Sequence, residues 1–195
     1  MSVLTVKSFT EPEVNMREIL RYAKSGTDDT ETARLVENCL AEALPKLTYK
    51  AVYTVANVLV TDSECNIDGI VIRSIALAKN LSGARRAVLV CATVGLGIDR
   101  LVARYTRSRP TRALIMQAIG AERVEAVLDA LTEELEKKYG RLRPRFSVGY
   151  GDAPLEAQRE MTERLDTAKT IGVSLSDNLI MTPTKSVTAI IGIDT

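Results

Sequence analysis

The sequence predicts a single mixed domain, α/β or α+β, and three observations lead to this fold class. The 195 residues suit one compact domain with a sizeable core. Runs of β-branched residues are interspersed with amphipathic segments, which indicates strands among helices. No repeat, linker or low-complexity tract divides the chain. We therefore expect one domain over residues 1–195, in which residues 1–15 form a loose N-terminal arm.

Helices and one strand are predicted for the first part of the chain. Val36, Leu40 and Ala43 repeat at helical spacing before Pro45, so a helix should begin near residue 30 and end there. Tyr49–Val60 is rich in β-branched and aromatic residues and predicts a strand. The other predictions are a helix over 16–24, a turn over 25–29, a polar turn over 62–68 and a helix over 71–81.

The second part begins with the apolar run 87–92, which is typical of a central strand buried on both faces. Gly95-Leu96-Gly97 then leads into a helix over 98–105. The third glycine of a dinucleotide fingerprint is replaced by the bulky Arg100, which argues against a nucleotide loop of that type. Further predictions are helices over 110–119, 122–139 and 154–166, with Gly120 separating the first two, and strands over 180–181 and 187–193.

The charge balance excludes several classes of partner. Lys and Arg number 26 against 25 Asp and Glu, a formal charge of +1. This gives no electrostatic reason to expect binding to nucleic acid or to an anionic membrane. No apolar run is long enough to span a bilayer, and the N-terminus lacks the apolar core of a signal peptide. We expect a cytoplasmic protein.

Cysteine and histidine usage restricts the chemistry. Cys39 and Cys91 lie in apolar segments and should be buried, whereas Cys65 lies in a polar segment and could be exposed. The chain has no histidine, which excludes a Ser-His-Asp triad and histidine metal sites. We therefore expect no metal site and no catalytic side chain.

The segment 143–152 is the main candidate for a binding site. Arg143 and Arg145 precede a Gly-Tyr-Gly turn, and the guanidinium fork matches a carboxylate or phosphate. Gly149 permits a close approach of the backbone, and Tyr150 offers a flat ring with a polar tip. The alternative interpretation is a solvated basic loop with an ordinary turn.

A resemblance favours the binding site. Arg145, Gly149 and Tyr150 fall on the Arg-x-x-x-Gly-Tyr signature of the activation (reactivation) domain of cobalamin-dependent methionine synthase. The stretches 92–99, 166–172 and 175–187 are similar to other parts of that family, so the resemblance covers most of the chain from Met16 onward. It implies an α+β fold, with a twisted, largely antiparallel sheet surrounded by helices.

The resemblance also implies a ligand, S-adenosylmethionine. Arg145 would bind its carboxylate and Arg143 would contribute less, while Ser147, Gly149 and Tyr150 would present backbone groups and a ring to the adenosine. Asp152 lies close enough in sequence to serve the ammonium, or it could cap the helix after Pro154.

One acidic residue on the long predicted helix belongs to the same site. Glu125 matches a position where the family has a ligand-binding acid, and it falls at the edge of the buried helical stripe. The alternative is an exposed helix acid. Glu122 falls nearly opposite the stripe and should be solvated.

The function implied is reductive methylation of cob(II)alamin with S-adenosylmethionine as methyl donor. Because no histidine is present to ligate cobalt, cobalamin should come from a separate methionine synthase core, with a flavodoxin-like protein as electron donor. The family's Tyr-containing stretch beyond the Ser-Val segment is absent, so contacts to adenine could differ. The alternatives are a partner of another corrinoid methyltransferase and a non-catalytic scaffold that binds a corrinoid protein.

Overall fold

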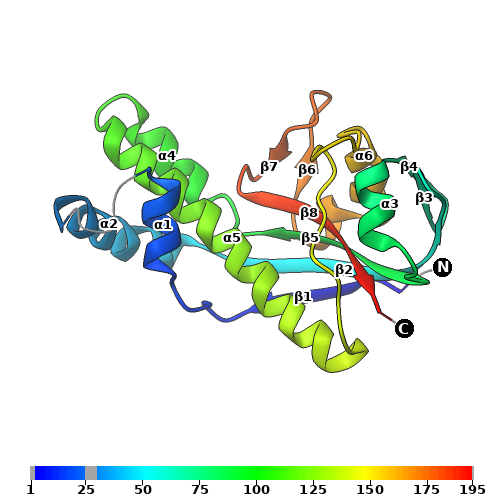
Figure 1. Cartoon of the computed structure of the whole chain (residues 1–195). Helices are drawn as coiled ribbons and strands as arrows, with labels where there is room; N and C mark the ends of the chain where they lie inside the picture. Colours follow the sequence, from blue (N-terminus) through cyan, green and yellow to red (C-terminus); the bar gives the residue numbers. More distant parts are fainter. Residues whose placement is uncertain (1–2, 25–29, 195) are drawn as a thin grey trace.

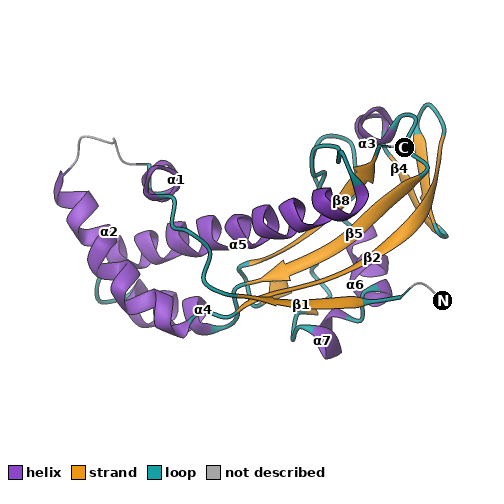
Figure 2. Ribbon diagram, turned by 90° about the horizontal axis from the view of Figure 1, so that it is seen from below, coloured by secondary structure: helices purple, strands orange, loops and turns teal. Residues whose placement is uncertain are grey.

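The computed structural model describes residues 3–24 and 30–194, which form an antiparallel sheet with helices on both faces (Figures 1 and 2). The strand order is β4-β3-β2-β5-β8, and β1 pairs with the same edge of β2 as β3. The strands are β1 (Thr5–Phe9), β2 (Tyr49–Val60), β3 (Glu64–Ile67), β4 (Ile70–Arg73), β5 (Arg86–Thr93) and β8 (Ser186–Ile193), and β6 (Ser174–Leu175) pairs separately with β7 (Met181–Thr182). The expected α+β fold is confirmed.

The helices divide between the two faces of the sheet. One face is covered by α1 (Met16–Tyr22), α2 (Thr30–Ala43), α4 (Gly97–Thr106) and α5 (Pro110–Tyr139), and the other by α3 (Ile75–Leu81) and α6 (Ala157–Arg164) (Figure 2). The short segments are the 3-10 helix η1 (Leu44–Lys46) and α7 (Thr167–Thr170). The turn expected over 25–29 lies outside the described residues. Within the described part of the chain, no helix has both the length and the apolar character needed to cross a membrane.

Strand β5 confirms the prediction of a central strand. It lies between β2 and β8, and its side chains alternate between two cores. Val88 and Val90 pack in the core on the α5 face, whereas Leu89 and Cys91 pack in the core on the α3 face. The continuous apolar run therefore reflects burial on both faces, with the period of two that a strand requires.

The described part of the N-terminal arm, residues 3–15, is not loose, which corrects the expectation for this segment. Strand β1 pairs with β2 from Thr5 opposite Tyr53 to Phe9 opposite Tyr49. The edge of β2 offers unpaired backbone donors and acceptors there, and a short alternating segment satisfies them. The arm is thereby fixed to the sheet before it reaches α1.

The region 62–73 is a β-hairpin, in place of the predicted turn and the start of the predicted helix. Strands β3 and β4 pair around Asp68 and Gly69, which have positive φ angles of 47° and 97°. Asp-Gly is a strong signal for such a tight turn, and it was missed. Cys65 lies on the inner face of this hairpin and is buried, so the expectation that it could be exposed is wrong.

Helix α5 runs unbroken for 30 residues, about 45 Å, through the glycine that was expected to divide it. A Cβ atom at Gly120 would lie 2.7 Å from Cγ of Lys185 and 3.0 Å from Cγ1 of Ile98. Glycine is therefore used here for close packing of α5 against α4 and the start of β8. One continuous helix carries Glu125 along the sheet.

Candidate functional site

The segment that precedes the Gly-Tyr-Gly turn runs antiparallel along the outer edge of β8. Phe146 exchanges two backbone hydrogen bonds with Ile190, of 2.9 and 2.8 Å, and Leu142 pairs with Ile193. Four steps separate Leu142 from Phe146, but only three separate their partners. One extra residue is therefore accommodated in this segment, which is the definition of a β-bulge.

The bulge directs the two arginines to opposite faces. The Arg143 guanidinium lies on the α3 face, where Nε donates to Oδ1 of Asp194 at 2.7 Å and Nη1 donates to the Asn80 carbonyl at 2.8 Å. Arg145 lies on the α5 face. This corrects the expectation that both arginines bind one ligand, because the Arg143 guanidinium binds Asp194 and Asn80 on the face opposite Arg145.

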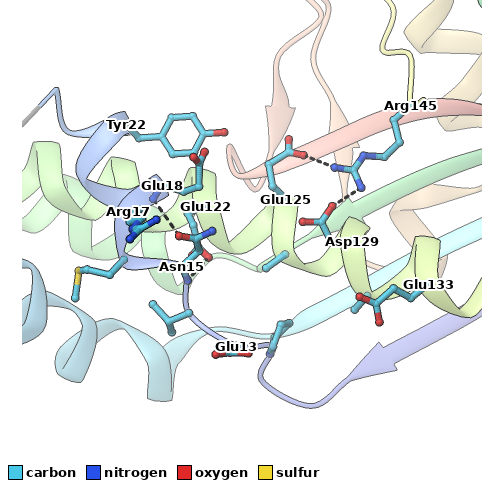
Figure 3. A pocket seen from close by; sticks show the side chains of 15 residues that line it. Glu13, Asn15, Arg17, Glu18, Tyr22, Glu122, Glu125, Asp129, Glu133 and Arg145 are labelled. Carbon is cyan, nitrogen blue, oxygen red and sulfur yellow. Dashed lines mark hydrogen bonds and ion pairs between the residues drawn. The ribbon is translucent and has the colours of Figure 1, made fainter. Parts of the chain in front are cut away.

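Arg145 is held by two carboxylates of α5 (Figure 3). Its Nη2 donates to Oε2 of Glu125 at 3.1 Å, and its Nη1 donates to Oδ1 of Asp129 at 2.6 Å and to Oγ1 of Thr132 at 3.4 Å. Glu125 and Asp129 are four residues apart, so they project from the same helical face. Glu125 thus lies at the edge of the buried stripe, where it was expected.

Two clefts meet at the pair formed by Arg145 and Glu125, since both residues line both clefts. The large cleft, about 950 Å³, lies between α5 and the segment 12–18 with α1. The small cleft, about 370 Å³, lies between α5, β8 and the Gly-Tyr-Gly loop, and Ser147 and Tyr150 line it. The structure therefore brings Arg145, Glu125, Ser147 and Tyr150 together.

The large cleft is strongly acidic. Its cationic lining residues are Arg17 and Arg145, whereas six carboxylate residues line it (Figure 3): Glu13, Glu18, Glu122, Glu125, Asp129 and Glu133. Such a lining attracts cationic groups. Among these six acids, only Glu125 was predicted to form part of the site.

Glu122 is buried, which corrects the expectation that it is solvated. It forms an ion pair with Arg123, whose side chain is fully buried, at 2.5 Å. Arg123 also donates to the carbonyl oxygens of Pro12 and Glu13 at 2.7 and 2.6 Å, and Glu122 accepts from the backbone N–H of Asn15 at 2.9 Å. This pair therefore fixes the segment 12–15 against α5 and so forms one wall of the large cleft.

The two residues that begin the Gly-Tyr-Gly loop have different roles: Tyr150 lines the small cleft, and Gly149 forms the turn. Gly149 has a φ of +87°, its N–H donates to the Ala153 carbonyl at 3.0 Å, and a Cβ there would lie 2.9 Å from Cδ1 of Leu155. Gly149 thus shapes the turn but does not line either cleft. Tyr150 is 73% exposed at the mouth of the small cleft.

Asp152 is a helix cap, which corrects both roles considered for it. It accepts from Oγ of Ser74 at 2.5 Å and from the backbone N–H groups of Ile75 and Ala76 at 2.6 and 3.2 Å. These bonds, with that of Ser74 first, lower the pKa of Asp152 below its ordinary value of 3.8. The carboxylate therefore caps α3, not the helix after Pro154, and does not line the clefts.

Asp129, Glu133 and the segment 12–18 belong to the site and were missed by sequence reasoning. Asp129 could have been found, because it lies one helical turn after Glu125 on the same face. The segment 12–18 carries no such signal. It reaches the cleft through contacts between residues more than 100 positions apart, such as Asn15 and Glu122.

The other reactive groups considered are the acidic residues and the cysteines of the described part of the chain. Among the described residues, no cluster of three or more cysteine, aspartate or glutamate side chains could hold a metal ion. Burial raises the pKa of Cys65 to about 11 and that of Cys91 to about 12, so these thiols stay protonated near neutral pH.

Comparison with known proteins identifies the fold. A solved structure of the MetH reactivation domain bound to AdoHcy superposes with a TM-score of 0.70, over 98% of this chain and 78% of that chain. This chain has the fold of the MetH reactivation domain. The sequences are only 13% identical, so the likeness establishes the fold alone. No protein-family model and no curated protein sequence matches the chain. The fold expected from the resemblance at residues 145–150 is confirmed.

Proposed function

We propose that this chain binds S-adenosylmethionine in the two clefts and acts as the reactivation component of a cobalamin-dependent methionine synthase. The cobalamin would be carried by a separate protein. The observation that carries the proposal is the position of Arg145, at the junction of the two clefts and between Glu125 and Asp129. This arrangement of side chains occurs in a chain whose fold is that of the MetH reactivation domain, which was solved bound to AdoHcy.

The side chains around Arg145 fit the chemical groups of S-adenosylmethionine. The guanidinium fork of Arg145 suits the carboxylate, and the carboxylate of Glu125 suits the neighbouring ammonium. The acidic lining of the large cleft favours a molecule that also carries a sulfonium charge. The exposed Tyr150 ring and the backbone of Ser147 suit the adenosine. When bound, S-adenosylmethionine supplies a methyl group attached to a cationic sulfur.

Binding requires Arg145 to exchange partners. Its guanidinium is occupied by Glu125 and Asp129, whose side chains are 41% and 64% exposed. Exposed pairs of this kind contribute only about 0–1 kcal/mol each, so a ligand carboxylate can replace them. The replacement would release Glu125 for the ammonium. The ion pairs therefore hold the groups in place before the ligand arrives, which reduces the entropy lost on binding.

The proposed role of the protein is to hold and aim the methyl donor. Catalysis by proximity and orientation needs no acid, base or nucleophile from this chain. The partners in this proposal are a cobalamin-bearing methionine synthase core and a flavodoxin-like electron donor. A flavodoxin-like donor would supply the electron that cob(II)alamin needs before it can accept the methyl group.

Titration calorimetry of the purified chain with S-adenosylmethionine, and separately with S-adenosylhomocysteine, tests the binding step. We expect both to bind with one site per chain. Failure of both to bind would contradict the proposal and favour the scaffold alternative.

A mixing experiment tests the function. The chain is combined with a methionine synthase core in the cob(II)alamin state, S-adenosylmethionine and a reduced flavodoxin-like protein, and the corrinoid spectrum is followed. Methylcobalamin should form only when every component is present. Binding of S-adenosylmethionine without methylation of this core would point to another corrinoid methyltransferase as the partner.

A further inference from the structure

A third hollow, here called the basic groove, lies between η1 and the first half of α4. Its volume is about 600 Å³, and none of its residues lines the two clefts around Arg145. Figures 1 and 2 place α4 beside α2 at one end of the molecule, far from α3 and α6. The lining residues are Lys46, Thr48, Leu96, Gly97, Arg100, Leu101 and Arg104. The proposed methyl-donor site therefore leaves this surface without a role.

One face of α4 combines an apolar residue with a row of cations. Leu96, Arg100, Arg104 and Arg107 follow one another at intervals of four, four and three residues, so they lie on the same helical face. Leu96 is 44% exposed. The exposed side chains of Arg100 and Arg107 form no hydrogen bond or ion pair with the described residues. An exposed leucine beside unpaired guanidinium groups is a surface suited to a complementary partner.

The described residues neutralise the positive charge of this face only in part. Glu42 is the carboxylate that pairs with Arg104, at 3.5 Å, but it also binds Arg112 at 2.8 Å. Lys46 donates to the backbone carbonyl of Glu42 and not to its carboxylate. The chain as a whole has a formal charge of only +1. Positive and negative charges are therefore separated on its surface, with cations on this face of α4 and carboxylates in the large cleft. Such a field steers an acidic partner.

The shape of the basic groove is fixed by backbone packing. Gly97 lies so close to η1 that a Cβ there would overlap the carbonyl oxygen of Lys46. Gly95 approaches the side chain of Thr48 in the same way. The floor of the groove is therefore preformed, while the cations at its rim stay exposed.

We propose that the basic groove is a docking site for an acidic protein surface that inserts an apolar side chain beside Leu96. An open hollow bordered by exposed cations lacks the buried polar groups that orient a small molecule. It does match a protein interface with an apolar centre and a charged rim. This proposal is independent of the methyl-donor site, because the two surfaces share no residue.

The test uses a short fluorescein-labelled helical peptide that carries glutamates around a central leucine pair, with binding followed by anisotropy. The double variant Arg100→Glu with Arg104→Glu should weaken binding by at least about tenfold, as charge reversal across an interface does. Leu96→Ser should weaken it by about threefold, because less apolar area is buried. Affinity should fall as salt is raised.

The matched control is Arg85→Glu with Arg86→Glu, which changes the net charge equally. These exposed arginines lie at the opposite end of β5 from α4, about 23 Å along the strand. The affinity of the control variant for the peptide should lie within about twofold of the wild-type affinity, because attraction to net charge alone is screened by salt. Equal weakening by both double variants would overturn the proposal, since it would show attraction to net charge alone.

Two further measurements complete the test. S-adenosylmethionine affinity and circular dichroism should be unchanged in the Arg100→Glu, Arg104→Glu variant, which shows that the variant is folded. A DNA duplex and phosphatidylglycerol vesicles are offered under the same conditions. Tighter binding to either than to the peptide would overturn the assignment of an acidic protein partner.

Discussion

Arg143 and Arg145 are two residues apart in a strand-like segment, yet their guanidinium groups lie on opposite faces of the sheet. In a regular strand, residues at this spacing share a face. The bulge between Leu142 and Phe146 reverses this relationship. Arg143 binds Asp194 and Asn80, while Arg145 binds Glu125 and Asp129. The two arginines therefore have separable roles, one structural and one assigned to the ligand.

Replacement of Arg145 by alanine should lower S-adenosylmethionine affinity by about 2–3 kcal/mol, roughly 30- to 150-fold, because a charge-assisted forked contact is lost. Arg143→Ala should leave affinity within about twofold, since its partners lie on the other face. Calorimetry measures both. Equal losses in the two variants would refute the separation of roles.

The two carboxylates that hold Arg145 should respond with opposite signs. Asp129→Asn removes a competitor for the guanidinium and should strengthen S-adenosylmethionine binding by about two- to threefold, as expected for an exposed pair. Glu125→Gln removes the proposed partner of the ammonium and should weaken binding by about five- to thirtyfold. Glu133→Gln, on the wall of the same cleft, is the control. Weaker binding by Asp129→Asn would contradict the exchange of partners.

The buried pair of Glu122 and Arg123 should be critical for stability. Arg123→Met leaves Glu122 buried without its partner and frees the carbonyls of Pro12 and Glu13. The expected loss is about 3–5 kcal/mol of unfolding free energy, measured by urea denaturation. Arg17→Met, at an exposed position, should stay within about 0.5 kcal/mol. A small effect of Arg123→Met would show that the segment 12–15 is held by other contacts.

The cap on α3 should make stability depend on pH. The folded state lowers the pKa of Asp152, so folding favours the carboxylate over the acid. The stabilisation is present above the ordinary pKa of 3.8 and is lost as the pH falls through the lower folded value. Asp152→Asn should therefore be less stable than the wild type at pH 7, and the gap should narrow below about pH 4. Urea midpoints across this range, with Asp62→Asn as an exposed control, give the measurement.

Local sequence determined the parts of this protein that depend on periodicity. The apolar run 87–92 predicted a strand buried on both faces, and β5 is that strand. Tyr49–Val60 matches β2 at both ends. Placement of Glu125 at the edge of a buried helical stripe also followed from the period of 3.6 residues. These features depend on which side of one element is apolar, and the residues of that element carry the information.

Tertiary structure alone decided the features that depend on contacts between distant segments. Gly120 lies inside α5, where Ile98 and Lys185 leave no space for a side chain. Neither of these two residues lies near Gly120 in the sequence, so the sequence did not show that this glycine serves packing. Glu122 is buried because the segment 12–15 packs over it, and Asp152 caps α3 from 76 to 78 residues away. Arg143 faces away from the clefts because its own segment, 142–146, forms a bulge where it pairs with β8. A residue's own segment sets its helical or extended period, but the direction of a side chain at an edge, a bulge or a cap is set by the partner that folding places there.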